Sequence, residues 1–220
     1  MNPTVLTCGN NLHLNPAKSY PTAYPQVIGQ ALGIYRDLGD RLGQANALLY
    51  LGDVRRMTGD YPAAAQDLQE ALGIYQDLGH RLGQANTLLY LGSMWRATGD
   101  YPAAAQDLQK ALSIYRDLGE PGDEAEALNE AGTLHRVCGD LRKAESCHQQ
   151  ALDLARQISD PWDEAHALAG LGRCALSAGH TDEAEDGLRQ ALEIFQRIGA
   201  AEAADVSREL GDLTKAGPTG

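Results

Sequence analysis

The residues with the greatest potential for chemistry lie in the second half of the chain. They are His135, Cys138, Cys147, His148, His166 and Cys174. His135 and Cys138 are three residues apart, so on a helix they would share a face, as helical metal ligands do. Cys147 and His148 are adjacent and would point about 100° apart, which suits a shared site poorly. No base or orienting acid stands at a matching spacing, so we predict no metal site, no cofactor and no enzyme.

An internal repeat of 40 residues must position these side chains. Residues 41–80 read RLGQANALLYLGDVRRMTGDYPAAAQDLQEALGIYQDLGH, and residues 81–120 repeat most of these letters. The predicted organisation is a half-repeat at 21–40, full repeats at 41–80, 81–120, 121–160 and 161–200, and a capping helix at 201–213. Residues 1–20 fit the period poorly and are predicted to be a worn cap or a flexible arm. Residues 214–220 are predicted to be a flexible tail.

Positions that do not change among the four copies indicate paired helices. Ala45, Leu48 and Gly52 follow the spacing i, i+3, i+7 of one helical face, and Ala64 and Ala71 belong to a second helix. Small residues at these positions let two helix backbones approach closely. A hairpin of this kind cannot bury its apolar face alone, so we expect an all-α stack. In this register His148 replaces a core leucine and Cys174 replaces a core valine, and both are interpreted as packing positions.

These invariant residues resemble the tetratricopeptide repeat. The motif of that family has a small residue after leucine in the first helix, here Leu51-Gly52. It has alanines at two points in the second helix, here Ala64 and Ala71, and a large apolar residue where Leu68 stands. The resemblance spans residues 21–213 and implies a right-handed α-α superhelix of four full helical hairpins with a half-repeat at each end.

The repeat length is similar to the long-repeat branch of that family, since the second helix is long and lacks the usual closing proline. The segment GQANALLYLGDVRRMTGDYPAAAQ, residues 43–66, most resembles the C-terminal repeat arrays of actinobacterial signal-transduction ATPases and antibiotic regulatory proteins. That resemblance implies a bacterial regulator. The chain has no GxxxxGK[ST] phosphate-binding motif and no basic recognition helix.

The charge of the chain argues against nucleic-acid and membrane partners. It carries 30 Asp and Glu residues against 18 Lys and Arg residues, a formal net charge of −12. An acidic field of this kind repels phosphate backbones and anionic lipids. No apolar run approaches the roughly 20 residues of a membrane-spanning helix. Residues 1–10 lack the pattern of a secretory signal and the four cysteines have no paired spacing, so we expect a cytoplasmic protein with reduced thiols.

The face of each first helix that is left over from packing could line a peptide groove on the concave side of the stack. Its members in the first two full repeats are Asn46, Leu49, Tyr50, Asp53 and Arg56, and Asn86, Leu89, Tyr90, Ser93 and Arg96. The third repeat offers Glu126, Asn129, Glu130, Thr133 and Arg136, of which Asn129 and Arg136 complete the predicted peptide-binding set.

Tyrosine provides a large contact area, asparagine can bond an extended backbone, and a ladder of arginines would suit acidic groups. The alternative is that Tyr50 and Tyr90 pack between repeats and that the arginines only offset nearby Asp and Glu. The first interpretation predicts a scaffold or regulatory module that binds an acidic or amphipathic protein segment. Two other functions stay open: a self-association module that forms a homo-oligomer, and a non-catalytic accessory subunit of a biosynthetic enzyme.

Overall fold

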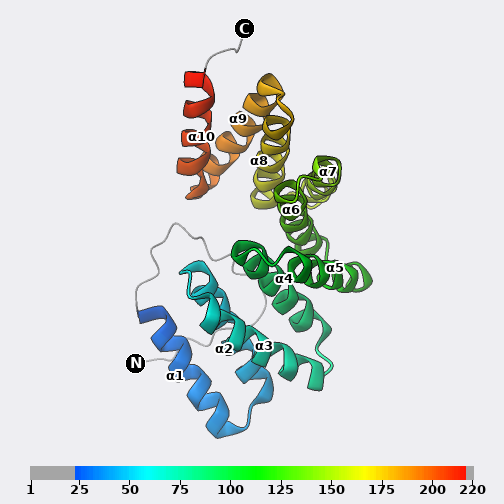
Figure 1. The fold of residues 1–220 in the computed structure, drawn as a ribbon. Helices are drawn as coiled ribbons and strands as arrows, with labels where there is room; N and C mark the ends of the chain where they lie inside the picture. The colour runs from blue at the N-terminus through cyan, green and yellow to red at the C-terminus, as the bar shows by residue number, and fades with distance from the viewer. Residues whose placement is uncertain (1–22, 217–220) are drawn as a thin grey trace.

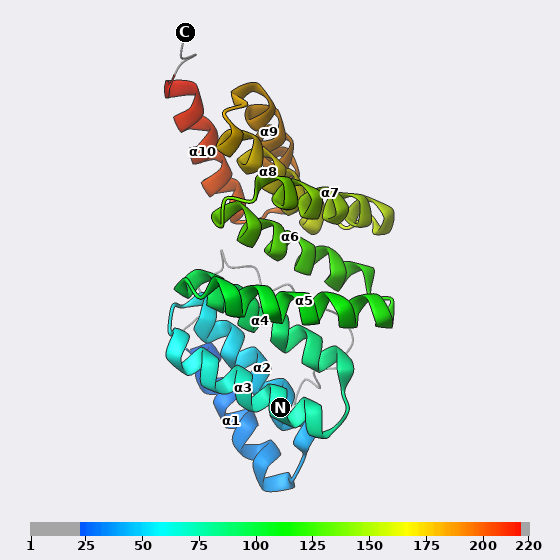
Figure 2. The same cartoon turned by 45° about the vertical axis from the view of Figure 1, so that its right-hand side comes forward.

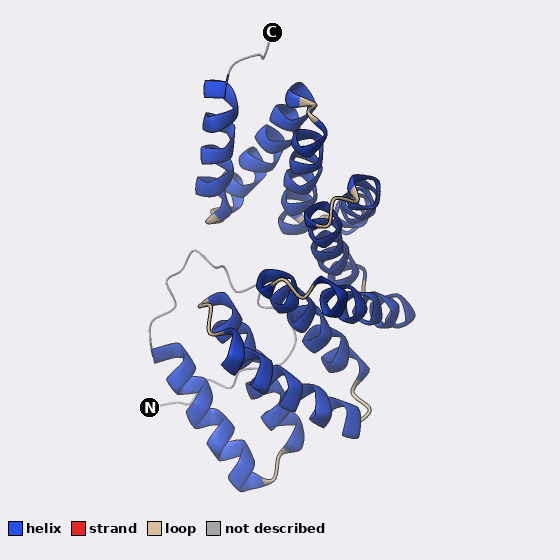
Figure 3. Ribbon diagram, viewed as in Figure 1, coloured by secondary structure: helices blue, strands red, loops and turns tan. Residues whose placement is uncertain are grey.

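The computed structural model describes residues 23–216, and within that range the chain forms helices joined by short loops and no strand (Figure 3). The helices are α1 (Ala23–Leu38), α2 (Arg41–Met57), α3 (Tyr61–Asp77), α4 (Arg81–Thr98), α5 (Tyr101–Leu118), α6 (Pro121–Val137), α7 (Leu141–Ile158), α8 (Pro161–Ala178), α9 (Thr181–Ile198) and α10 (Glu202–Ala216). Consecutive helices pack against each other in chain order along a curved array (Figures 1 and 2).

The predicted fold class is confirmed. The pairs α2–α3, α4–α5, α6–α7 and α8–α9 are the four full hairpins, and α1 and α10 are the half-repeats at the two ends. One boundary differs from the prediction, because α10 continues to Ala216 and therefore includes residues assigned to a flexible tail. The predicted arm at 1–20 and the last residues, 217–220, lie outside the described part of the chain.

Each hairpin turns in the same way, and this keeps the repeats in register. Gly59 and Gly99 take left-handed backbone angles, with φ of +82° and +87°, which cost glycine little. The next residue in each case is an aspartate that caps the following helix: the Asp100 carboxylate accepts a hydrogen bond of 3.1 Å from the backbone N–H of Ala103. Ser159 is the one non-glycine residue of the described chain with a positive φ, 59°. The turns at Gly59 and Gly99 therefore join the two helices of their hairpins in the same way.

The two helices of a hairpin cross at small side chains. Ala45 and Ala64 are fully buried, and a Cβ built on Gly52 would lie 2.7 Å from Cγ of Leu68. The α8–α9 crossing is a contact between backbones, since a Cβ on Gly187 would lie 3.1 Å from Cα of Gly172. Close approach of this kind lets the large side chains around the crossing interlock.

In the first two full hairpins, a tyrosine near the C-terminal end of the second helix binds the first helix of its own hairpin. The Tyr75 hydroxyl on α3 donates a hydrogen bond of 2.7 Å to Oδ1 of Asn46 on α2. Its ring also packs on α4, where a Cβ built on Gly83 would lie 2.5 Å from the ring carbons. The same bond joins Tyr115 to Asn86 over 2.9 Å.

Removing one of these hydroxyl groups is expected to have a measurable cost. The Tyr75→Phe variant leaves the Asn46 amide oxygen without its donor, so the free energy of unfolding should fall by about 1 kcal/mol. Urea denaturation followed by circular dichroism at 222 nm measures this difference. Tyr101→Phe is the matched control, because no hydrogen bond to that hydroxyl occurs within the described chain; equal losses in both variants would contradict the assigned role.

Candidate functional site

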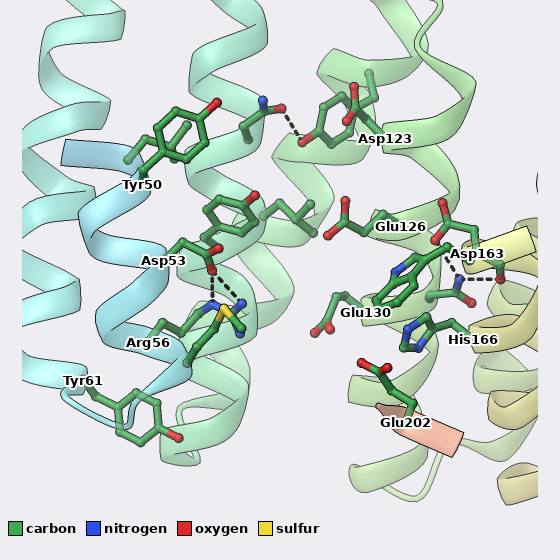
Figure 4. Close-up of a pocket in the computed structure, with 18 residues that line it drawn as sticks. Tyr50, Asp53, Arg56, Tyr61, Asp123, Glu126, Glu130, Asp163, His166 and Glu202 are labelled. Atoms are coloured by element: carbon green, nitrogen blue, oxygen red, sulfur yellow. Dashed lines mark hydrogen bonds and ion pairs between the residues drawn. The ribbon is translucent and has the colours of Figure 1, made fainter. Parts of the chain in front are cut away.

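The hollow side of the array contains a recess of about 460 Å³. Most of the side chains that line it come from the first helices of successive repeats, α2, α4, α6 and α8, and one comes from α10 (Figure 4). The recess therefore depends on several repeats being stacked. In Figure 4 the residues of α2 lie on one side of the recess, and those of α6, α8 and α10 lie on the other.

Eight of the twelve predicted peptide-binding residues line this recess. They are Leu49, Tyr50, Asp53, Arg56, Asn86, Leu89, Tyr90 and Asn129. The other four are Asn46, Ser93, Arg96 and Arg136, and none of them is among the lining residues. Asn46 holds the Tyr75 hydroxyl, and the buried Ser93 accepts a hydrogen bond of 3.3 Å from Arg56. Arg136 is half-buried outside the recess.

The arginines do not form the open ladder expected for an acidic partner. The Arg56 guanidinium pairs with the buried carboxylate of Asp53 on its own helix, at 2.7 Å. Arg96 pairs with Glu130 of the next repeat, at 3.1 Å. Burial alone would raise the pKa of Glu130. The positive charges of Arg96 and Arg56 outweigh that effect and lower the pKa below its ordinary value. These two arginines offset neighbouring acids, as the alternative interpretation held.

The two tyrosines of the predicted strip have different environments. Tyr50 is 43% exposed at the rim of the recess. Tyr90 is half-buried and packs against the core residues of two neighbouring repeats. The guanidinium of Arg56 lies over the Tyr90 ring, 5.6 Å from its centre. Tyr50 is therefore the member of the pair that presents its ring to an incoming molecule.

Carboxylates dominate the recess, and sequence reasoning missed most of them as functional candidates. Among the described residues that line it, six carry a carboxyl group and one carries a guanidinium. The acids are Asp53, Asp123, Glu126, Glu130, Asp163 and Glu202. The sequence does contain a signal, because Asp123 and Asp163 occupy the position that Gly43 and Gly83 hold in the earlier repeats. The structure places Asp123 and Asp163 among the residues that line the recess.

Asp163 is the most strongly perturbed of these acids. Its side chain is 1% exposed, and Oδ1 accepts a hydrogen bond of 3.4 Å from Nδ2 of Asn129. Its Oδ2 has no hydrogen-bond partner in the described chain. Burial, with a further contribution from the carboxylate of Asp160, raises the pKa of Asp163 from 3.8 to about 7. Burial also raises the pKa of Glu126 well above 4.5, and the charge of Asp163 adds to that effect.

His148 and Cys174 are buried packing residues, as the repeat register predicted, whereas Cys138 is exposed and His166 lines the recess. His148 is 1% exposed, and its Nδ1 lies 3.2 Å from Oδ1 of Asn129. Burial lowers the pKa of His148 to about 4, so the ring is neutral at pH 7. Burial raises the pKa of the Cys147 and Cys174 thiols, which disfavours the reactive thiolate. The described residues contain no group of three or more His, Cys, Asp or Glu side chains arranged to hold a metal ion.

Repeated helical hairpins with a recess on their inner face define a helical-repeat solenoid. The sequence profile of the tetratricopeptide repeat matches residues 43–117 and 123–197, and the chain belongs to this family. A comparison with curated protein sequences gave no match. Within residues 23–216, no helix combines the length and the apolar character that crossing a membrane requires.

Several solved structures share this fold. BtubC (BKLC) from P. vanneervenii is 21% identical, with a TM-score of 0.72 over 87% of this chain and 82% of that one. A Rap protein complexed with Competence and Sporulation Factor is 19% identical, with a TM-score of 0.69 over 76% of this chain and 48% of that one. A signal transduction ATPase with numerous domains and a tetratricopeptide repeat sensor, from Pyrococcus horikoshii, is 17% identical, with a TM-score of 0.63 over 79% of this chain. The match covers 26% of the ATPase.

Proposed function

We propose that this chain is a protein-interaction module that holds a peptide segment of a partner protein in its recess. The observation that carries the proposal is the recess itself, which side chains of successive first helices build together around the exposed Tyr50 ring. Aromatic rings and buried polar groups that converge on a concave surface are typical of peptide sites. Tetratricopeptide repeats generally mediate protein–protein contacts, and the Rap protein of similar fold was solved with a bound factor.

The charge of the recess changes the kind of partner that we propose. An acidic segment would meet six carboxylates and an Arg56 that is already paired with Asp53. Like charges at short range disfavour binding, so the lining favours a segment with basic or neutral side chains. We place the chain in the bacterial cytoplasm as a scaffold or regulatory module, in keeping with its likeness to the repeat sensor of a signal-transduction ATPase.

Substitution of the exposed tyrosine tests the proposal. We expect random twelve-residue peptides selected on the immobilised wild-type chain to bind the Tyr50→Ala variant about tenfold more weakly or worse, because the ring supplies contact area at the rim. Fluorescence anisotropy of labelled peptides measures the dissociation constants. The thermal midpoint should change little, since Tyr50 is largely outside the core.

The matched control is Leu118→Ala, which removes a side chain of similar exposure, 39%, at the end of α5 and outside the recess. Its affinity for the selected peptides should equal that of the wild type. Failure to select any peptide, or equal affinity of the wild type and Tyr50→Ala, would overturn the proposal. Light scattering on the same samples distinguishes peptide binding from self-association.

A further inference from the structure

The tyrosine–asparagine hydrogen bond that joins the two helices of a hairpin in the first two full repeats lacks its donor in the third. In the repeat before it, the Tyr115 hydroxyl donates to the side chain of Asn86. Forty residues further on, the tyrosine position is Ala155 and the asparagine position is Glu126. Glu126 lines the recess and makes no hydrogen bond or ion pair with any described residue. Glu126 is therefore a strong acceptor at the position that receives a tyrosine hydroxyl hydrogen bond in the first two full repeats.

Asp163 stands at the repeat position that meets this ring elsewhere. The Tyr75 ring packs so closely on Gly83 that a Cβ there would lie 2.5 Å from it. The residues 80 positions further on are Ala155 and Asp163, so Asp163 has no tyrosine ring opposite it, whereas Asp123 at the equivalent position lies near Tyr115. Asp163 is among the residues that line the recess, its side chain is 99% buried, and its Oδ2 has no hydrogen-bond partner within the described chain. A buried carboxylate oxygen without a donor is destabilising unless a ligand satisfies it.

Two arginines of the neighbouring first helices are already engaged with other acids. Arg56 is bound to Asp53 and Arg96 is bound to Glu130. Glu126 and Asp163 therefore project into the recess from α6 and α8 as acceptors (Figure 4). The rings of Tyr90 and Trp162 also line the recess, and aromatic faces attract cations. Carboxyl groups with aromatic rings beside them match an ammonium or guanidinium group, because a bound cation favours the ionised form of both acids.

We propose that Glu126 and Asp163 form a subsite that binds a basic side chain, arginine or lysine, of the partner peptide. The ammonium or guanidinium group donates to the Glu126 carboxylate in place of the missing tyrosine hydroxyl, and to Oδ2 of Asp163. The subsite rests on the proposed peptide-binding function and specifies the residue that the peptide must carry. It selects against acidic peptides because their side chains meet the same two carboxylates.

A titration with minimal ligands tests the subsite directly. The probes are N-acetyl-arginine amide, N-acetyl-lysine amide and the uncharged isostere N-acetyl-citrulline amide, each added to the 15N-labelled chain at fixed ionic strength. We expect saturable shifts of the Glu126 and Asp163 amide signals with the arginine or the lysine probe and none with the citrulline probe. The Glu126→Gln and Asp163→Asn variants should bind the basic probes at least ~tenfold more weakly. The control Glu193→Gln removes the same charge from an exposed site on α9 outside the recess and should bind normally.

A second variant rebuilds the arrangement of the earlier repeats. Ala155→Tyr combined with Asp163→Gly restores the ring and the glycine seen at Tyr75 and Gly83, so the subsite should be filled and binding of the arginine probe abolished. Unchanged helical circular dichroism would establish that this variant is folded. The subsite proposal would be overturned if the three subsite variants bound the basic probes as tightly as the wild type does. It would also be overturned if the wild type bound the citrulline probe as tightly as the basic probes.

The two proposals fail in different ways. The subsite would be overturned, with peptide binding intact, by two results together. The selected peptides would need Tyr50 but show no enrichment in arginine or lysine, and the basic probes would cause no NMR shifts. A selection that returns no peptide, together with a positive titration, would overturn peptide binding and leave a site for basic groups.

Discussion

The Gly187→Leu variant is expected to lose about 3 kcal/mol or more of its free energy of unfolding. A side chain at this position would meet the backbone of α8, since a Cβ there would already lie 3.1 Å from Cα of Gly172 and 3.2 Å from the carbonyl oxygen of Leu168. Backbone atoms of a packed helix cannot rotate away as a side chain can, so the two helices must separate. Urea denaturation followed by circular dichroism measures the loss.

The matched control is the same substitution at Gly73 on α3, where a Cβ would have no neighbour within 4 Å. Leucine is the better helix former, so Gly73→Leu should be neutral or stabilising by up to ~1 kcal/mol. Because each repeat contacts mainly its neighbours, the damage from Gly187→Leu should be concentrated in α8, α9 and α10. Amide hydrogen exchange should therefore become faster in those three helices and stay slow in α2 to α5. A small loss of unfolding free energy, or faster exchange spread evenly over all helices, would contradict the backbone contact.

The Asp163→Asn variant is expected to be more stable than the wild type by about 2–4 kcal/mol at pH 8, with little difference at pH 4. Burial raises the pKa of the folded carboxyl group to about 7 from an ordinary value of 3.8. As pH rises through about 4, the unfolded chain loses this proton while the folded chain keeps it, so folding becomes less favourable. The cost is complete once pH exceeds 7. The amide of the variant has no charge to bury and keeps an acceptor for Asn129.

Other ionisable groups surround Asp163 and contribute to the absolute pH profile. Some of these groups interact electrostatically with Asp163 or with its neighbours, and others line the same recess. They include Asp123, Glu126, Glu130, His148, Asp160, His166 and Glu202. His148 acts in the opposite direction: its folded pKa of about 4 means that stability falls as pH drops from 6.5 toward 4. The difference between wild type and variant, measured by urea denaturation at each pH, isolates Asp163. A difference that does not vary between pH 4 and 8 would contradict the raised pKa.

The helices and their pairing could be predicted from the sequence because local signals repeat at every junction. A residue with a left-handed backbone ends most of these helices, glycine in every case but Ser159, and the invariant Ala45 and Ala64 mark the crossing. All of these signals act over a few residues or within one hairpin. The end of α10 was predicted too early because no glycine-aspartate pair follows Leu213.

The recess was harder to predict because its charges pair across helices. The Arg96 partner, Glu130, is 34 residues away, so helix spacing alone could not show that this arginine is engaged. The carboxylates were missed for a different reason. The positions that stay the same in every repeat indicate helix packing. Asp163 and Ala155 differ from the glycine and tyrosine of the first repeats, and only this difference points to the acidic recess. The residues that depart from the repeat pattern are therefore the ones that distinguish one part of the recess from another.

The shared turn geometry also bears on how such a molecule can evolve. Residues 41–80 and 81–120 are almost the same sequence, and each unit ends in a left-handed glycine. Tandem coding segments this alike can misalign during recombination, which removes or adds whole units. After such an event, the same turn would connect the repeats on either side of the new junction, so every helix would still have a compatible neighbour. The inner surface of the stack could thus become longer or shorter by whole repeats.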